Sequence, residues 1–79
     1  MIVFEFFASL ERQAGSREYR LDGGFATVGD ALAALAAERP DLATLLERCA
    51  CASGDAIVRR ADTVPRDGRI AVLPPVAGG

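Results

Sequence analysis

Residues 2–8, IVFEFFA, form a hydrophobic and aromatic run that a single charge, Glu5, interrupts. Such a run predicts a β-strand from Ile2 to Ala8. Successive side chains of a strand point to opposite faces, so Phe6 lies on one face of this strand and Phe7 on the other. Because both faces are largely apolar, we expect this strand to lie in the interior of a sheet rather than at its edge.

The rest of the chain adds strands and helices to this one. Ser9 is expected to cap a short helix over residues 10–14, which Gly15 ends. Thr27 is expected to begin the main helix, with Asp30 in its first turn, and Pro40 to end it. The hydrophobic pattern predicts the other elements: a strand over 17–21, a second short helix or an extension of the main helix beyond a kink over 41–49, a strand over 56–58, a strand or loop over 62–65 and a last strand over 70–73. This order, with helices covering one face of a small mixed sheet, predicts an α+β domain.

Length and charge indicate one small globular domain over residues 1–79. The net charge is −2, and the nine basic residues, all arginine, are scattered among eleven acids. No basic stripe suggests nucleic-acid binding, and no apolar run approaches the length of a membrane span. Since no signal peptide is visible either, we expect a soluble cytoplasmic protein. The absence of lysine also leaves no side-chain amine through which copies of the chain can be linked.

Few residues are suited to catalysis or metal binding. Cys49 and Cys51 are the only cysteines and histidine is absent, so no zinc ligand set and no usual base for a nucleophile exist. We interpret both cysteines as small, half-buried apolar groups in a reducing cytosol. The spacing from Gly24 to Gly29 resembles a phosphate loop, but Asp30 stands where lysine should follow and would repel phosphate. The chain is therefore poorly equipped to be an enzyme alone, and we expect it to bind no metal or cofactor itself.

The end of the chain, LPPVAGG at residues 73–79, carries the clearest functional signal. Pro74 and Pro75 have a restricted φ, which predicts a stiff, unpaired arm leaving the final strand. Gly78 and Gly79 add flexibility and no side chain that would collide with a narrow channel. At roughly 3.3 Å per residue the arm, residues 74–79, extends about 20 Å from the body. The alternative interpretation is an inert, frayed terminus.

This ending, with Asp67-Gly68 and a hydrophobic strand before it, resembles that of the small subunit of molybdopterin synthase. That family comprises ubiquitin-like sulfur carriers with the β-grasp fold. The opening strand, the short turn after it and the main helix ending before Pro40 are similar as well, so the resemblance covers nearly the whole chain. Two positions depart from the family's pattern: Arg59 stands where asparagine is often found, and Arg69 where an acidic residue is common.

The resemblance implies a route for sulfur through Gly79. A partner adenylyltransferase of the ubiquitin-activating type would use MgATP to join Gly79 to AMP, and a sulfur donor would convert the acyl-adenylate to a thiocarboxylate. Docked in the large subunit of molybdopterin synthase, this group would donate sulfur to a pterin precursor. The arm that reaches these partners would consist of Pro74, Pro75, Val76, Ala77 and Gly78. The alternatives are a sulfur carrier for thiamine or cysteine synthesis, a modifier attached to lysines of target proteins, and an interaction domain with an inert tail.

Phe7 and Leu73 are candidates for the surface that a partner would contact. The helices can cover only one face of the sheet, which leaves an apolar face for a partner. Ordinary core positions are the alternative for both residues.

Overall fold

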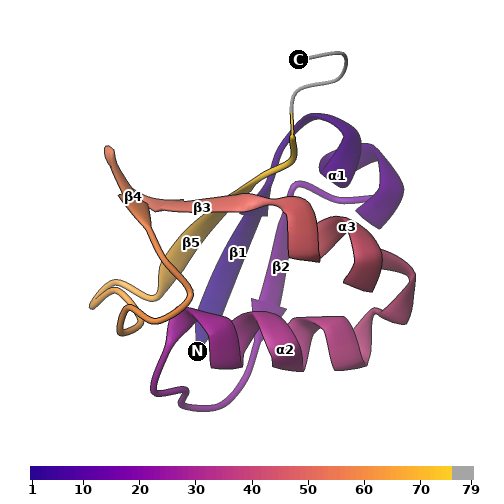
Figure 1. The fold of residues 1–79 in the computed structure, drawn as a ribbon. Helices are drawn as coiled ribbons and strands as arrows, with labels where there is room; N and C mark the ends of the chain where they lie inside the picture. The colour runs from indigo at the N-terminus through magenta and orange to yellow at the C-terminus, as the bar shows by residue number, and fades with distance from the viewer. Residues whose placement is uncertain (76–79) are drawn as a thin grey trace.

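The computed structural model describes residues 1–75, which form a five-stranded sheet and its covering helices (Figure 1). Their order along the chain is β1 (Ile2–Phe6), α1 (Ala8–Ala14), β2 (Glu18–Leu21), α2 (Val28–Glu38), the 3₁₀ turn η1 (Pro40–Leu42), α3 (Ala43–Arg48), β3 (Ala50–Ser53), β4 (Ala56–Val58) and β5 (Arg69–Leu73). In this part of the chain, every helix is too short to cross a membrane.

The strands lie in the order β2-β1-β5-β3-β4. β1 is parallel to β5, with Val3 opposite Arg69, whereas β1–β2, β5–β3 and β3–β4 are antiparallel pairs. The sheet is therefore mixed, as predicted, and the expectation that the opening strand lies in its interior is confirmed. The first and last strands of the chain are neighbours at the centre of the sheet.

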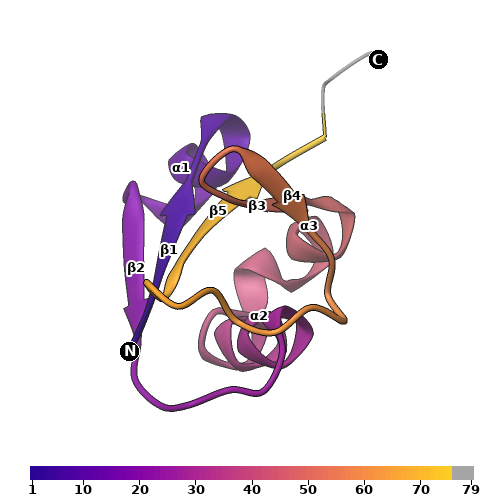
Figure 2. The same cartoon turned by 90° about the vertical axis from the view of Figure 1, so that its left-hand side faces the viewer.

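The core lies between the sheet and the helices α2 and α3, which lie on the same side of it (Figure 2). Alternate residues of β1 and β5 enter this core, so Phe4, Phe6, Ile70 and Val72 are fully buried. Helix α2 contributes mainly aliphatic side chains spaced by one helical turn, and the fully buried ones are Val28, Ala31 and Leu35. The opposite face of β1 and β5 carries no helix.

The predicted ends of the main helix are confirmed. Thr27 is the N-cap of α2, and its hydroxyl accepts a hydrogen bond of 3.1 Å from the backbone N–H of Asp30. The helix ends at Glu38, two residues before Pro40, because proline cannot continue the hydrogen-bond pattern. Gly15 ends α1 in the left-handed conformation at a φ of 82°.

The junction between β1 and α1 differs from the prediction. The strand ends at Phe6 rather than Ala8, and α1 begins at Ala8, which adopts a positive φ of 51°. Ser9 is therefore inside the helix, and the prediction that it caps the helix is wrong. The N-cap is Phe7, whose backbone carbonyl accepts from the N–H groups of Leu10 and Glu11.

Strand β3 was not predicted, because its small residues, ACAS, carry no strong hydrophobic pattern. It forms a hairpin with β4 through Gly54, which has a φ of 59°. The segment 62–65 is a loop with a single bridge between Thr63 and Thr27. This loop is fastened to the start of α2, since Val28 N–H donates to the carbonyl of Asp62.

Candidate functional site

The predicted arm starts from a strand that is held on both sides. Val72 lies opposite Phe6 of β1, and Leu73 lies opposite Ala50 of β3. Pro74 lacks an N–H group, so the ladder cannot continue beyond it. The chain leaves the sheet at the end where α1 lies (Figure 1). The predicted site residues Val76, Ala77, Gly78 and Gly79 lie outside the described residues.

The two residues predicted to contact a partner meet at this exit. The Phe7 side chain is 41% exposed, and Leu73 is partly buried. Both line one hollow of about 390 Å³, together with Pro74 and Pro75. Their neighbours in sequence, Phe6 and Val72, face the opposite side of the sheet and are fully buried. The structure thus places Phe7 and Leu73 in the wall of one hollow, and their contact with a partner stays a prediction.

The remaining wall of the hollow comes from Ala8, Ser9 and Arg12 of α1. Arg12 is exposed, and it is the charged residue of this wall. Sequence reasoning did not select Arg12. The spacing of four residues indicates only that Arg12 lies on the same face of the helix as Ala8. That this face borders the C-terminal end of β5 follows from the tertiary structure.

Charged residues on the same face of the sheet compensate one another. Glu5 and Glu18 lie directly opposite each other on β1 and β2, which places like charges together. The Arg69 guanidinium donates to Glu5 at 2.7 Å and to Glu18 at 2.9 Å. The hydrogen bond to Glu5, followed by that to Glu18, raises the pKa of Arg69. Arg69 stands where an acidic residue is common in the family that the sequence resembles. Here it bridges Glu5 and Glu18 and so offsets their repulsion.

An exposed apolar residue of β4 extends this helix-free face. Ile57 is 67% exposed and lies opposite Ala52, which in turn lies opposite Ala71 of β5. The sequence predicted the strand but not the side to which Ile57 points, because a three-residue strand has too short an alternation to define its buried face.

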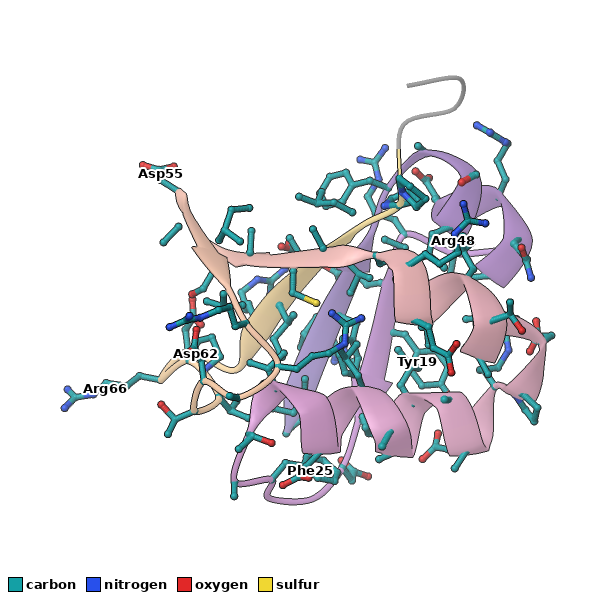
Figure 3. All side chains as sticks on the ribbon, viewed as in Figure 1. Tyr19, Phe25, Arg48, Asp55, Asp62 and Arg66 are labelled. Carbon is teal, nitrogen blue, oxygen red and sulfur yellow. The ribbon has the colours of Figure 1, made fainter. Side chains whose placement is uncertain are left out.

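On the covered side, one hydrogen bond fastens the outer strand to the main helix. The Tyr19 hydroxyl of β2 donates to the Glu38 carboxylate at the end of α2, at 2.6 Å (Figure 3). This hydrogen bond is the largest cause that raises the pKa of Tyr19. The contact links β2 to the C-terminal end of α2.

Both cysteines are buried free thiols, Cys49 at the end of α3 and Cys51 in β3. Cys49 Sγ donates to the carbonyl of Leu45 at 3.2 Å. Burial raises the pKa of both thiols, which disfavours the reactive thiolate. Within residues 1–75, no three His, Cys, Asp or Glu side chains come together as a set of metal ligands. The candidate functional site is therefore the hollow at the C-terminal end of β5, where the arm begins.

A family model described as the ThiS family matches residues 4–79. SAMP1 from Haloferax volcanii is 31% identical in its crystal structure, with 99% of this chain and 98% of that chain covered and a TM-score of 0.81. A crystal structure of H. volcanii small archaeal modifier protein 1 is 30% identical, with coverages of 95% and 97% and a TM-score of 0.80. No curated protein matches significantly.

A more distant similarity is to a protein–protein complex of subunits 1 and 2 of molybdopterin-converting factor from Helicobacter pylori 26695. The identity is 23%, the coverages are 99% and 97%, and the TM-score is 0.67. At this identity the similarity concerns the fold alone. Together with the other two structures, it confirms the predicted β-grasp, ubiquitin-like fold.

Proposed function

Because the chain belongs to the ThiS family of ubiquitin-like sulfur carriers, we propose that it is the sulfur-donating small subunit of a molybdopterin synthase. The observation that supports this proposal best is the ending LPPVAGG, joined to a strand that is paired on both sides up to Leu73. The fold shared with a subunit of the H. pylori molybdopterin-converting factor complex is consistent with it.

The proposed chemistry begins at the Gly79 carboxylate. A carboxylate is a poor electrophile, because its charge repels nucleophiles and oxide is a poor leaving group. A partner adenylyltransferase joins it to the α-phosphorus of MgATP and releases pyrophosphate. A sulfur donor that delivers sulfide-level sulfur then attacks the acyl carbon and displaces AMP, which leaves the thiocarboxylate. In the large synthase subunit, two such carriers supply the two dithiolene sulfurs to one pterin precursor. Activated covalent steps of this kind replace one difficult transfer by easier ones.

The stem of the arm suits this task. Ordering a free arm in a partner costs about 1–2 kcal/mol per residue in backbone entropy. Pro74 and Pro75 are already restricted in φ, so they lose less entropy on binding. The pairing of Leu73 with Ala50 fixes the point from which the arm starts. A partner that binds the body thereby also positions the start of the arm.

A second candidate function is a ubiquitin-like modifier of other proteins. The observation that favours it is the similarity to small archaeal modifier protein 1, at 30% identity over 95% of this chain. In this role the same Gly79 acyl-adenylate forms, but a lysine amine of a target displaces AMP and forms an isopeptide bond. The first step is therefore common to both functions, and only the nucleophile of the second step differs.

The intact mass of the protein separates these functions. After incubation with an activating enzyme of the adenylyltransferase type, MgATP and a sulfur donor, a sulfur carrier gains about sixteen daltons as oxygen is replaced by sulfur. The loaded protein is then given the large synthase subunit and the pterin precursor, and formation of molybdopterin identifies the branch. Loading without molybdopterin formation favours the thiamine or cysteine branch. Adducts on target lysines without the sixteen-dalton gain favour the modifier.

Leu73→Asp is expected to weaken binding to the large synthase subunit, because a charge at the exit of β5 has to lose its water in an apolar interface. We expect a loss of at least about tenfold in affinity, measured by calorimetry. Arg66→Asp, on the loop at the other end of β5, is the control and is expected to bind normally. Unchanged binding by a folded Leu73→Asp protein would remove Leu73 from the interface.

A further inference from the structure

The hollow at the base of the arm combines apolar walls with one charge. Phe7 and Leu73 supply the apolar side chains, and Pro74 and Pro75 form the wall nearest the arm. Arg12 of α1 contributes the positive charge at its rim. A protein that takes the arm into its active site has to pass over Pro74 and Pro75. Because Pro74 and Pro75 also line this hollow, the same protein contacts it.

The charge of Arg12 is not compensated by the residues around it. Among residues 1–75, no carboxylate lies within ion-pair distance of Arg12. The neighbouring Glu11 is paired instead with Arg17, at 3.7 Å. The acids of the helix-free face, Glu5 and Glu18, are both held by Arg69. Arg12 is exposed, and no acid of residues 1–75 occupies its guanidinium, so the group is available to a carboxylate of a partner.

We propose that this hollow receives an acidic side chain of the activating enzyme, which the Arg12 guanidinium binds while an apolar neighbour of that acid packs on Phe7 and Leu73. The guanidinium presents paired N–H donors whose geometry matches a carboxylate. The proposal rests on the proposed function only through adenylation of Gly79. Because that step is shared by the sulfur carrier and the modifier, the activating enzyme is the partner required in either role.

The test uses the full chain with a purified adenylyltransferase of the ubiquitin-activating type, and it measures ATP–pyrophosphate exchange against carrier concentration. Arg12→Glu is expected to raise the KM for the carrier about tenfold or more and to change kcat less than about twofold, because docking is weakened but the arm is intact. Arg12→Lys keeps the charge and loses the paired donors, so a rise of about two- to threefold is expected. Arg66→Glu makes the same charge change far from the arm and is expected to leave KM unchanged (Figure 3).

The salt dependence of KM provides a second test. The KM of the wild-type carrier is expected to rise with salt concentration, and that of Arg12→Gln is expected to rise less, because screening weakens an exposed ion pair. Equal salt dependence of the two proteins contradicts the proposal.

The outcomes separate this proposal from the proposed function. If the wild-type chain supports no exchange, the proposed function fails. If it supports exchange and Arg12→Glu matches Arg66→Glu, the role of Arg12 is wrong. A fall in kcat at constant KM also overturns the proposal, since it places Arg12 in the chemical step. Loss of wild-type self-association in Arg12→Glu, detected by sedimentation, identifies a second copy as the occupant and overturns it as well.

Discussion

A Gly79→Ala variant is expected to show no sixteen-dalton gain after incubation with the activating enzyme, MgATP and a sulfur donor. The proposed reactive group is the carboxylate of this residue, and its attack on the α-phosphorus requires close approach inside a narrow channel. A methyl group on the adjacent carbon obstructs that approach, whereas glycine leaves it open. An extra residue after Gly79 is expected to have the same effect, because it moves the carboxylate past the reacting position. Intact-mass spectrometry measures both.

A matched control distinguishes the terminal residue from the arm as a whole. Ala77→Ser changes a neighbouring position in the arm by one hydroxyl group and keeps the final glycine pair, so it is expected to load normally. Thermal unfolding of all three variants is expected to match that of the wild type, since none of them substitutes a residue of the core that residues 1–75 form. Normal thiocarboxylate formation on Gly79→Ala would show that Gly79 is not the site of loading.

Phe4→Ala is expected to have the largest effect on stability. Phe4 is fully buried at the centre of the core, and truncation of such a side chain removes about 3–5 kcal/mol through lost apolar burial and a residual cavity. A domain of this size has a free energy of unfolding of about 4–12 kcal/mol, so this single change removes a large part of it. Urea denaturation followed by circular dichroism measures the difference.

Phe7→Ala provides the comparison, since it truncates the same residue type three positions further along the chain. The Phe7 side chain is 41% exposed, so its loss is expected to cost about 1 kcal/mol or less. Phe7→Ala is also expected to weaken binding to the large synthase subunit. Phe4 is buried and is not predicted to contact that subunit. A loss of stability in Phe7→Ala equal to that in Phe4→Ala would mean that Phe7 belongs to the core.

Much of the fold could be predicted because its main elements have strong local signals. The aromatic run of β1, the Thr27 cap and Pro40 each restrict the backbone within a few residues. The helix-free face also followed from the sequence, since a chain this short supplies helices for only one side of its sheet. Phe7 and Leu73 were selected as candidates for an apolar face in this way, and the structure places both in the wall of one hollow.

The remaining features depend on contacts between distant segments. Strand β3 is built from small residues, and its pairing with β5 and β4, rather than its own propensity, makes it a strand. The cap at Ser9 was wrong because the pairing of β1 with β5 ends at Phe6, which lets α1 begin earlier. Arg12 was missed for a related reason. Arg12 lines the hollow because α1 packs beside the C-terminal end of β5, and no local sequence pattern predicts that contact.

The central pairing of β1 with β5 bears on how the protein is made. Val3 and Arg69 are far apart in the sequence, so β1 stays without this neighbour until β5 has been synthesised. Contacts between such distant residues form slowly, because a long loop has to close before they add stability. A truncated or stalled product therefore has an incomplete sheet and exposes strand edges that invite aggregation or proteolysis. In this architecture the sheet is complete only once β5, the strand that leads to the arm, has joined β1.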